Sequence, residues 1–196
     1  MAHDGQDLTL TTQTILPDLL SLTAAAVDPT IKVVDMAKAR VHSMVESEGR
    51  ISGALIEENQ TAAHGFAWLA TYVESLRQMQ GWAERLHAEG KFGEVEQLIH
   101  QIAFGEYLWQ IYGGIQMNQG EMVRLQDMGL GQEDMRVLMT PEVMRLTQDG
   151  NTQAARVRLV ELMQERSAEH TVGACGLDDE LEMIREQFRR FSLDKV

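Results

Sequence analysis

The sequence is short of cysteine, proline and basic residues, and each shortage excludes a class of protein. A single cysteine, Cys175, excludes a disulfide framework within one chain, and only three prolines interrupt 196 residues. Lys and Arg together number 17 against 30 Asp and Glu, which gives a formal net charge of −13. Because an acidic surface repels phosphate groups, we expect no nucleic-acid partner.

Long apolar runs are also missing. No stretch approaches the roughly 20 apolar residues of a membrane-spanning helix, and residues 1–7 are polar without a basic and apolar targeting signal. We therefore expect a cytoplasmic protein with no membrane partner and a disordered tail over residues 1–7. A chain of this length buries roughly 70% of the surface that its unfolded form exposes, so it needs no metal or disulfide to fold.

Apolar residues recur at helical spacing, and no alternating run typical of a strand lies between turn signals. We predict an all-α fold, an up-and-down helical bundle with appended short helices. The bundle spans residues 8–130, a helical appendage 131–166, a linker 167–177 and an amphipathic helix 178–196. Within the bundle, Pro17 is expected to open a first helix, and Asp28-Pro29 to end it before a second helix begins.

A helical hairpin over residues 51–114, turning at residues 89–91, organises the bundle. Each arm shows an apolar face at spacings of three and four. The first face is Leu55, Asn59, Ala62, Phe66, Leu69, Val73, Leu76, Gln80 and Ala83; the second is Val95, Leu98, Ile102, Trp109 and Tyr112. The aromatic stripe across the hairpin, Trp68, Tyr72, Trp109 and Tyr112, is expected to be core rather than a cofactor site.

The second arm ends at Gly113-Gly114, for which the sequence leaves two interpretations open. The pair either only ends the helix or allows a ligand to lie against the backbone. Residues 119–125, directly after it, read as a further short helix.

Residues that could carry chemistry do not form a complete set. Glu84 and His87 have the Glu-x-x-His spacing of a di-iron bundle, but the second copy that such a centre requires is missing. Cys175 has no base beside it outside its own glycine-bearing stretch. We therefore predict neither a metal site nor a catalytic residue.

Residues 110–127, with the sequence QIYGGIQMNQGEMVRLQD, resemble the C-terminal helical domain of the flavin-dependent acyl-CoA dehydrogenases. In that family a glutamine, two glycines, an arginine and an aspartate mark the contact with the adenine-dinucleotide end of the FAD held by a neighbouring subunit. The resemblance implies that Gln110, Gly113, Gly114 and Arg124 bind the cofactor. Elsewhere in the pattern, a glycine and an arginine are replaced by glutamines.

Residues 178–196 look like the first helix of an acyl-CoA dehydrogenase core. A bundle, a linker and such a helix, in this order, are similar to the arrangement in the methylsuccinyl-CoA dehydrogenases, in which a helical extension precedes the core. For the parent enzyme the resemblance implies FAD-dependent dehydrogenation of a branched dicarboxylic acyl-CoA, with electrons passed to an electron-transfer flavoprotein.

The resemblance leaves open whether this chain is itself an enzyme, because 196 helical residues lack the β-domain and the catalytic base of the parent. We expect an N-terminal extension with a structural or oligomerisation role, inactive alone, whose partner is the dehydrogenase core or a second copy of itself. One alternative is a helical domain that contacts flavin or acyl-CoA. The other is a free-standing adaptor with Phe188 and Phe191 on its partner surface.

Overall fold

The computed structural model describes residues 14–165 and 175–195. In this part of the chain the fold is all-α, as predicted, with two pairs of very short strands. The α-helices are α1 Leu19–Val45, α2 Gly53–Glu58, α3 Gln60–Ala88, α4 Glu94–Gly113, α5 Gln132–Met135, α6 Pro141–Asp149, α7 Gln153–Glu165 and α8 Asp179–Lys195. The strands are β1 Glu46–Ser47, β2 Arg50–Ile51, β3 Ile115–Gln116 and β4 Met122–Val123, and 3₁₀ turns cover Leu125–Met128 and Arg136–Leu138.

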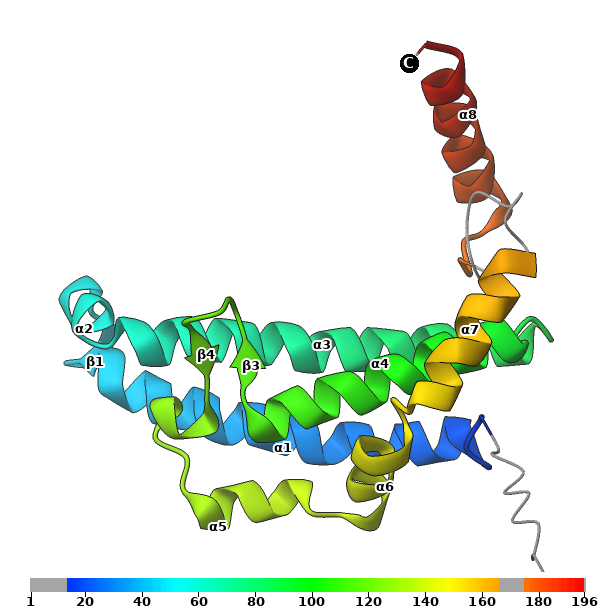
Figure 1. Cartoon of the computed structure of the whole chain (residues 1–196). Coiled ribbons are helices and arrows are strands. Elements are labelled where there is room, and N and C mark those ends of the chain that lie inside the picture. The colour runs from blue at the N-terminus through cyan, green and yellow to red at the C-terminus, as the bar shows by residue number, and fades with distance from the viewer. Residues whose placement is uncertain (1–13, 166–174, 196) are drawn as a thin grey trace, which may run out of the picture.

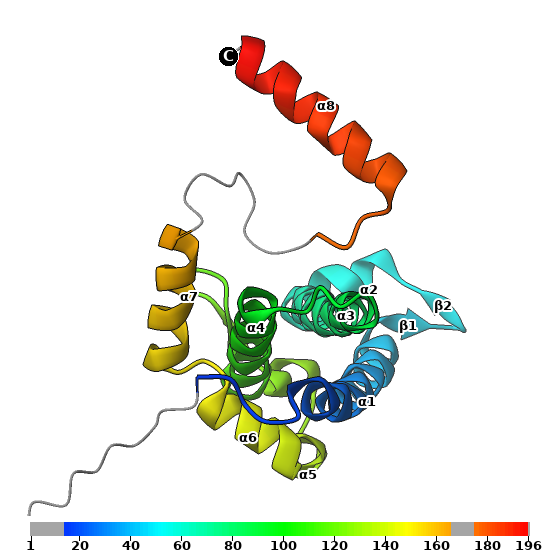
Figure 2. The same ribbon diagram turned by 90° about the vertical axis from the view of Figure 1, so that its right-hand side faces the viewer.

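Three long helices, α1, α3 and α4, run side by side in alternating directions and enclose the core (Figure 1). Figure 2 looks nearly along their axes and shows α6 and α7 packed on the flank of α4. One buried cluster joins α1, α3, α4 and α6 through residues such as Val33, Leu69, Phe104 and Leu146. The bundle is therefore up-and-down, and the elements after it complete its core.

Helix α1 is continuous through Pro29, where we expected a break. A proline inside a helix removes one backbone hydrogen bond and crowds the preceding turn. Val27 and Val33, on either side of Pro29, are buried in the same cluster, and the Thr30 hydroxyl donates to the Val27 carbonyl at 2.6 Å. Packing on both sides thus outweighs the local cost. The helix begins at Leu19, shortly after Pro17.

The first arm of the hairpin follows the predicted face. Leu69, Leu76 and Ala83 have no exposed surface, and the turn between α3 and α4 includes Gly90 at φ +69°. The arm is divided at Asn59, which lies between α2 and α3 and whose side-chain amide donates to the Leu55 carbonyl at 2.9 Å. The long seam is therefore carried mainly by α3.

The second arm buries a different face from the one predicted near its end. Phe104, Leu108 and Ile111 are buried, whereas Trp109 and Tyr112 are 57% and 37% exposed. Successive side chains of a helix point about 100° apart around its axis. A buried face made of Phe104, Leu108 and Ile111 therefore leaves Trp109 on another side of the helix. The prediction that Trp109 and Tyr112 belong to the core was wrong.

The chain after α4 forms a β-hairpin, not the helix expected over residues 119–125. Ile115 pairs with Val123 and Gln116 with Met122. The Asn118 Oδ1 atom accepts hydrogen bonds from the backbone N–H groups of Gly120 and Glu121 at 2.8 and 2.9 Å. The Asn118 side chain thus pairs backbone N–H groups that a helix would otherwise pair, and the backbone reverses direction here.

Helix α8 starts as predicted, with the Asp178 carboxylate accepting from the Leu181 N–H at 2.8 Å. It extends away from the bundle in both views (Figures 1 and 2). The predicted tail over residues 1–7 and the linker residues 167–174 lie outside the described residues, so the proposed boundaries there stay predictions.

Candidate functional site

The candidate site is the corner where α4 ends and the β3–β4 hairpin begins. Gly114 has φ +126°, a backbone conformation that residues other than glycine rarely adopt. Its N–H donates to the Gln110 carbonyl at 2.7 Å. A Cβ atom on Gly114 would lie 2.5 Å from the Met122 sulfur, whereas one on Gly113 would meet nothing within 4 Å. Met122 of β4 thus occupies the space that Gly114 leaves open, and only Gly113 faces free space.

Gln110 uses both ends of its amide within the protein. Its Oε1 accepts from the Tyr72 hydroxyl at 2.9 Å, and its Nε2 donates to Glu106 at 2.6 Å. The other oxygen of Glu106 accepts from the Asn151 amide at 2.6 Å. Burial, reinforced by nearby Tyr107 and Glu106, raises the pKa of Tyr72, so its hydroxyl stays protonated as a donor. This network links α3, α4 and the turn between α6 and α7.

Arg124 lies at the same corner as the glycines. The hairpin pairs Ile115 with Val123. Continuing this antiparallel register by one residue places Arg124, which follows Val123, opposite Gly114, which precedes Ile115. The Arg124 side chain is exposed, and its backbone N–H donates to Asp127 at 2.8 Å. The structure therefore brings Gly113, Gly114 and Arg124 together, while Gln110 is turned toward α3.

A cleft of about 540 Å³, lined in part by Met122, lies between the hairpin and the start of α3. His64 borders it: its Nε2 accepts from the Trp68 indole N–H at 3.1 Å and lies 3.7 Å from a Glu121 oxygen. The sequence interpretation missed this cleft because it missed the hairpin. Asn118 and Gly120, both typical of turns, were the signal that could have indicated it.

A buried polar chain in the core was also missed. Thr23 of α1 lies 2.9 Å from the His100 Nε2 atom and donates to Gln80 at 2.7 Å, and Gln80 donates to Glu84 at 2.9 Å. His100 has no exposed surface, and burial lowers its pKa to about 4. Its place four residues before the buried Phe104, on the same face of α4, was the available signal. These hydrogen bonds connect α1, α3 and α4 inside the core.

Across residues 14–165 and 175–195, no three His, Cys, Asp or Glu side chains gather as ligands for a metal ion. Within those residues no helix combines the length and apolar character needed to cross a bilayer.

Sequence comparison relates the chain to part of a dehydrogenase. It is 51% identical over 189 residues to (2S)-methylsuccinyl-CoA dehydrogenase from Cereibacter sphaeroides. The chain matches a fragment of an acyl-CoA dehydrogenase. The match covers 95% of this chain and 33% of the relative, so the chain spans about a third of the enzyme's length. No protein-family model matches the chain.

The predicted resemblance to acyl-CoA dehydrogenases is thereby confirmed. The relative's name identifies it as a dehydrogenase that acts on (2S)-methylsuccinyl-CoA. The role of the glycine corner in such an enzyme is a separate question. Of its four predicted residues, Gln110 hydrogen bonds to Tyr72, and Met122 fills the space beside Gly114.

Proposed function

We propose that this chain is the N-terminal helical extension of an FAD-dependent acyl-CoA dehydrogenase of the methylsuccinyl-CoA type. Its role is structural or in oligomerisation, and it is inactive alone. The observation that carries the proposal is the 51% identity over 95% of the chain to a dehydrogenase of which it spans only 33%. Flavin, substrate and the electron-transfer flavoprotein belong, in this proposal, to the remainder of the enzyme.

The use of the buried polar groups supports a structural role. Thr23, Gln80 and Gln101 are buried, and each hydrogen bonds to a neighbouring main chain or side chain. Catalytic groups, by contrast, are held at a cleft where they can reach a substrate. The polar interior of this bundle therefore stabilises the arrangement of helices. In the parent, α8 would be the first helix of the core.

The test is complementation of a truncated relative. The Cereibacter sphaeroides enzyme is produced without the third that this chain matches, and the present chain is added in trans. We expect the chain alone to show no flavin absorbance, and the mixture to regain assembly and methylsuccinyl-CoA-dependent dehydrogenation. Flavin at the chain's own stoichiometry, or no binding to the truncated enzyme, would overturn the proposal.

A second candidate function is contact with flavin or acyl-CoA at the glycine corner through Gln110, Gly113, Gly114 and Arg124. Two observations favour it: Gly113 faces free space, and the exposed Arg124 guanidinium carries a positive charge suited to a phosphate. Exposed Trp109 and Tyr112 in the last turns of α4 add aromatic surface.

Calorimetric titration of the chain with FAD and with methylsuccinyl-CoA separates this candidate from the first. Binding that is lost in Arg124→Glu and kept in Arg136→Glu, an exposed arginine on another element, would establish the corner as a ligand site. Absence of binding by the wild-type chain leaves the structural proposal standing and removes this one.

A further inference from the structure

A second cleft lies at the end of the bundle where α1 begins and α3 ends. We call it the end cleft, and its lining includes Asp18, Leu20, Ala24, Glu84, His87 and Phe92. Its volume is about 1430 Å³. Small-molecule sites in proteins occupy roughly 300–1,000 Å³, so the end cleft is large enough to receive a segment of protein chain.

The lining of the end cleft is apolar and acidic. Leu20 and Phe92 contribute half-buried apolar side chains, and Ala24 keeps the wall formed by α1 low. The charged side chains are those of Asp18 and Glu84, and no lysine or arginine belongs to the described part of the lining. A complementary occupant therefore carries a basic group beside an apolar one.

Both carboxylates lack a counter-charge. Asp18 precedes α1 at the place where an aspartate usually caps a helix, but it has φ 54° and its side chain makes no capping hydrogen bond. Within the described residues its carboxylate has no other partner. Glu84 accepts a hydrogen bond at 2.9 Å from the neutral amide of Gln80, which is only 7% exposed and itself accepts from Thr23. A buried side chain thus fixes Glu84 at the cleft without neutralising it.

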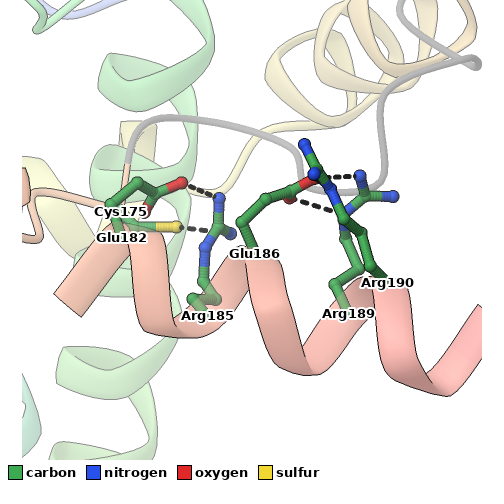
Figure 3. Close-up of polar contacts among 6 residues, drawn as sticks. All are labelled: Cys175, Glu182, Arg185, Glu186, Arg189 and Arg190. Atoms are coloured by element: carbon green, nitrogen blue, oxygen red, sulfur yellow. Dashed lines mark hydrogen bonds and ion pairs between the residues drawn. The ribbon is translucent and has the colours of Figure 1, made fainter. Parts of the chain in front are cut away.

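The basic side chains of α8 are not the missing cations. Arg185 binds Glu182, and Arg189 and Arg190 both bind Glu186 (Figure 3). A cation that matches the end cleft therefore has to come from beyond the described chain.

The dehydrogenase core, in the function proposed above, begins with α8, and α8 leaves the bundle beside the end cleft. Gly176 lies so close to α3 that a Cβ on it would be 3.4 Å from the Trp82 ring and 3.5 Å from Leu86. Trp82 and Leu86 belong to the same turns of α3 as Glu84, which lines the cleft. Figure 1 shows that the start of α1, the end of α3 and the base of α8 lie at one end of the bundle. The core is thus tethered next to this cleft.

We infer that the end cleft receives a basic, partly apolar segment of the dehydrogenase core. The inference rests on the proposed function, and it names the surface of the extension that binds the core and the charge of the segment that binds there. Asp18 and Glu84 pair with the basic group, and Leu20 and Phe92 cover the apolar part of the segment.

The first experiment compares thiol labelling at two neighbouring positions of α1. Ala24 and Ala25 are both exposed, but only Ala24 lines the end cleft. Each is replaced by cysteine in a Cys175→Ser background, in the chain alone and in a complete chimeric enzyme. In the chimera, the 196 residues replace the matched third of the Cereibacter sphaeroides dehydrogenase.

We expect maleimide to label Ala24→Cys about 10-fold or more slowly in the chimera than in the isolated chain, because the docked segment excludes the reagent. Labelling of Ala25→Cys should differ by no more than about twofold. Mass spectrometry of the peptide that contains residues 24 and 25 measures both rates.

The second experiment removes the two carboxylates in the chimera. Asp18→Asn with Glu84→Gln keeps the size of each side chain and an acceptor oxygen. We expect the protection of Ala24→Cys to fall about fivefold or more, because ion pairs with the docked segment are lost. Asp35→Asn with Glu58→Gln is the matched control, since it removes the same charge from two exposed acids outside the cleft. Equal loss in both double variants would overturn the assignment of the carboxylates.

Equal labelling of Ala24→Cys in the isolated chain and in an assembled, flavin-containing chimera would overturn the inference and leave the proposed function standing. Labelling of the isolated chain that slows as its concentration rises would show that a second copy covers the cleft, and would also overturn it. A chimera that does not assemble would remove the proposed function and this inference together.

Discussion

Gly105 of α4 lies against Gly150 at the end of α6, so closely that a Cβ on Gly150 would be 3.0 Å from the Gly105 Cα. A Cβ on Gly105 would meet the backbone of residues 146–151 at 2.7–3.0 Å. Since main chain cannot move aside as a flexible side chain can, both glycines are required for the contact between α4 and α6.

We expect Gly105→Ala to lower the free energy of unfolding by about 2 kcal/mol or more, because the added methyl group forces the two helices apart. Denaturant unfolding followed by circular dichroism measures it. Gly113→Ala is the control: its Cβ would meet nothing within 4 Å, so the change should be within about 0.5 kcal/mol. Equal effects of the two substitutions would show that the close approach is not what matters.

Gln101 of α4 hydrogen bonds to the main chain of the segment before α1 and so holds that segment against the bundle. Its Oε1 accepts from the Leu16 N–H at 2.6 Å, and its Nε2 donates to the carbonyls of Thr14 and Gly150 at 3.0 and 3.1 Å. Gln101→Leu leaves these main-chain groups without their partner, and we expect a loss of about 3 kcal/mol. Hydrogen exchange at Leu16 should accelerate. Gln78→Leu, on the exposed side of α3, should do neither.

His100 predicts a specific pH dependence. Burial lowers its folded-state pKa to about 4, whereas an unfolded histidine titrates near 6.5. Between these values the unfolded chain binds a proton that the folded chain does not, so stability falls as the pH is lowered through this window. The loss should be on the order of 3 kcal/mol, measured by urea unfolding at a series of pH values.

His100→Gln is the control for that pH series, because an amide does not titrate. Its stability should change less between pH 6.5 and 4.5 than that of the wild type. Glu74 and Glu186 have pKa values lowered to about 2 by hydrogen bonds to arginine, so they act mainly at lower pH. An unchanged slope in the variant would assign the pH dependence to other groups.

Gly114→Val combines an unfavourable φ with a clash against Met122. We expect a loss of about 1–3 kcal/mol whether or not a cofactor binds, measured by thermal unfolding. Adding Met122→Ala should recover the part due to the clash and leave the backbone part. Full recovery in the double variant would mean that the φ of +126° costs nothing at this position.

The sequence was informative where periodicity and packing agree, as along α3 from Leu69 to Ala83. It misled where tertiary contacts override a local signal: Pro29 stays inside α1 because both flanking turns are buried. It also misled at Trp109, since which face of α4 is covered depends on the placement of α6, which local spacing does not reveal. At the corner, glycine spacing indicated an unusual backbone but could not show that Met122 fills the space beside Gly114.

The elements after Leu130 have a consequence for any attempt to shorten this polypeptide. Leu138, Val143 and Leu146 are buried in the same cluster as Val33 and Phe104. Deleting residues 131–166 would therefore remove side chains that cover the shared core and expose apolar side chains of α1 and α4 to water. Ala155 and Leu162 of α7 form a second buried cluster with Val95 and Leu98 of α4, so the smallest autonomous unit should extend at least to the end of α7.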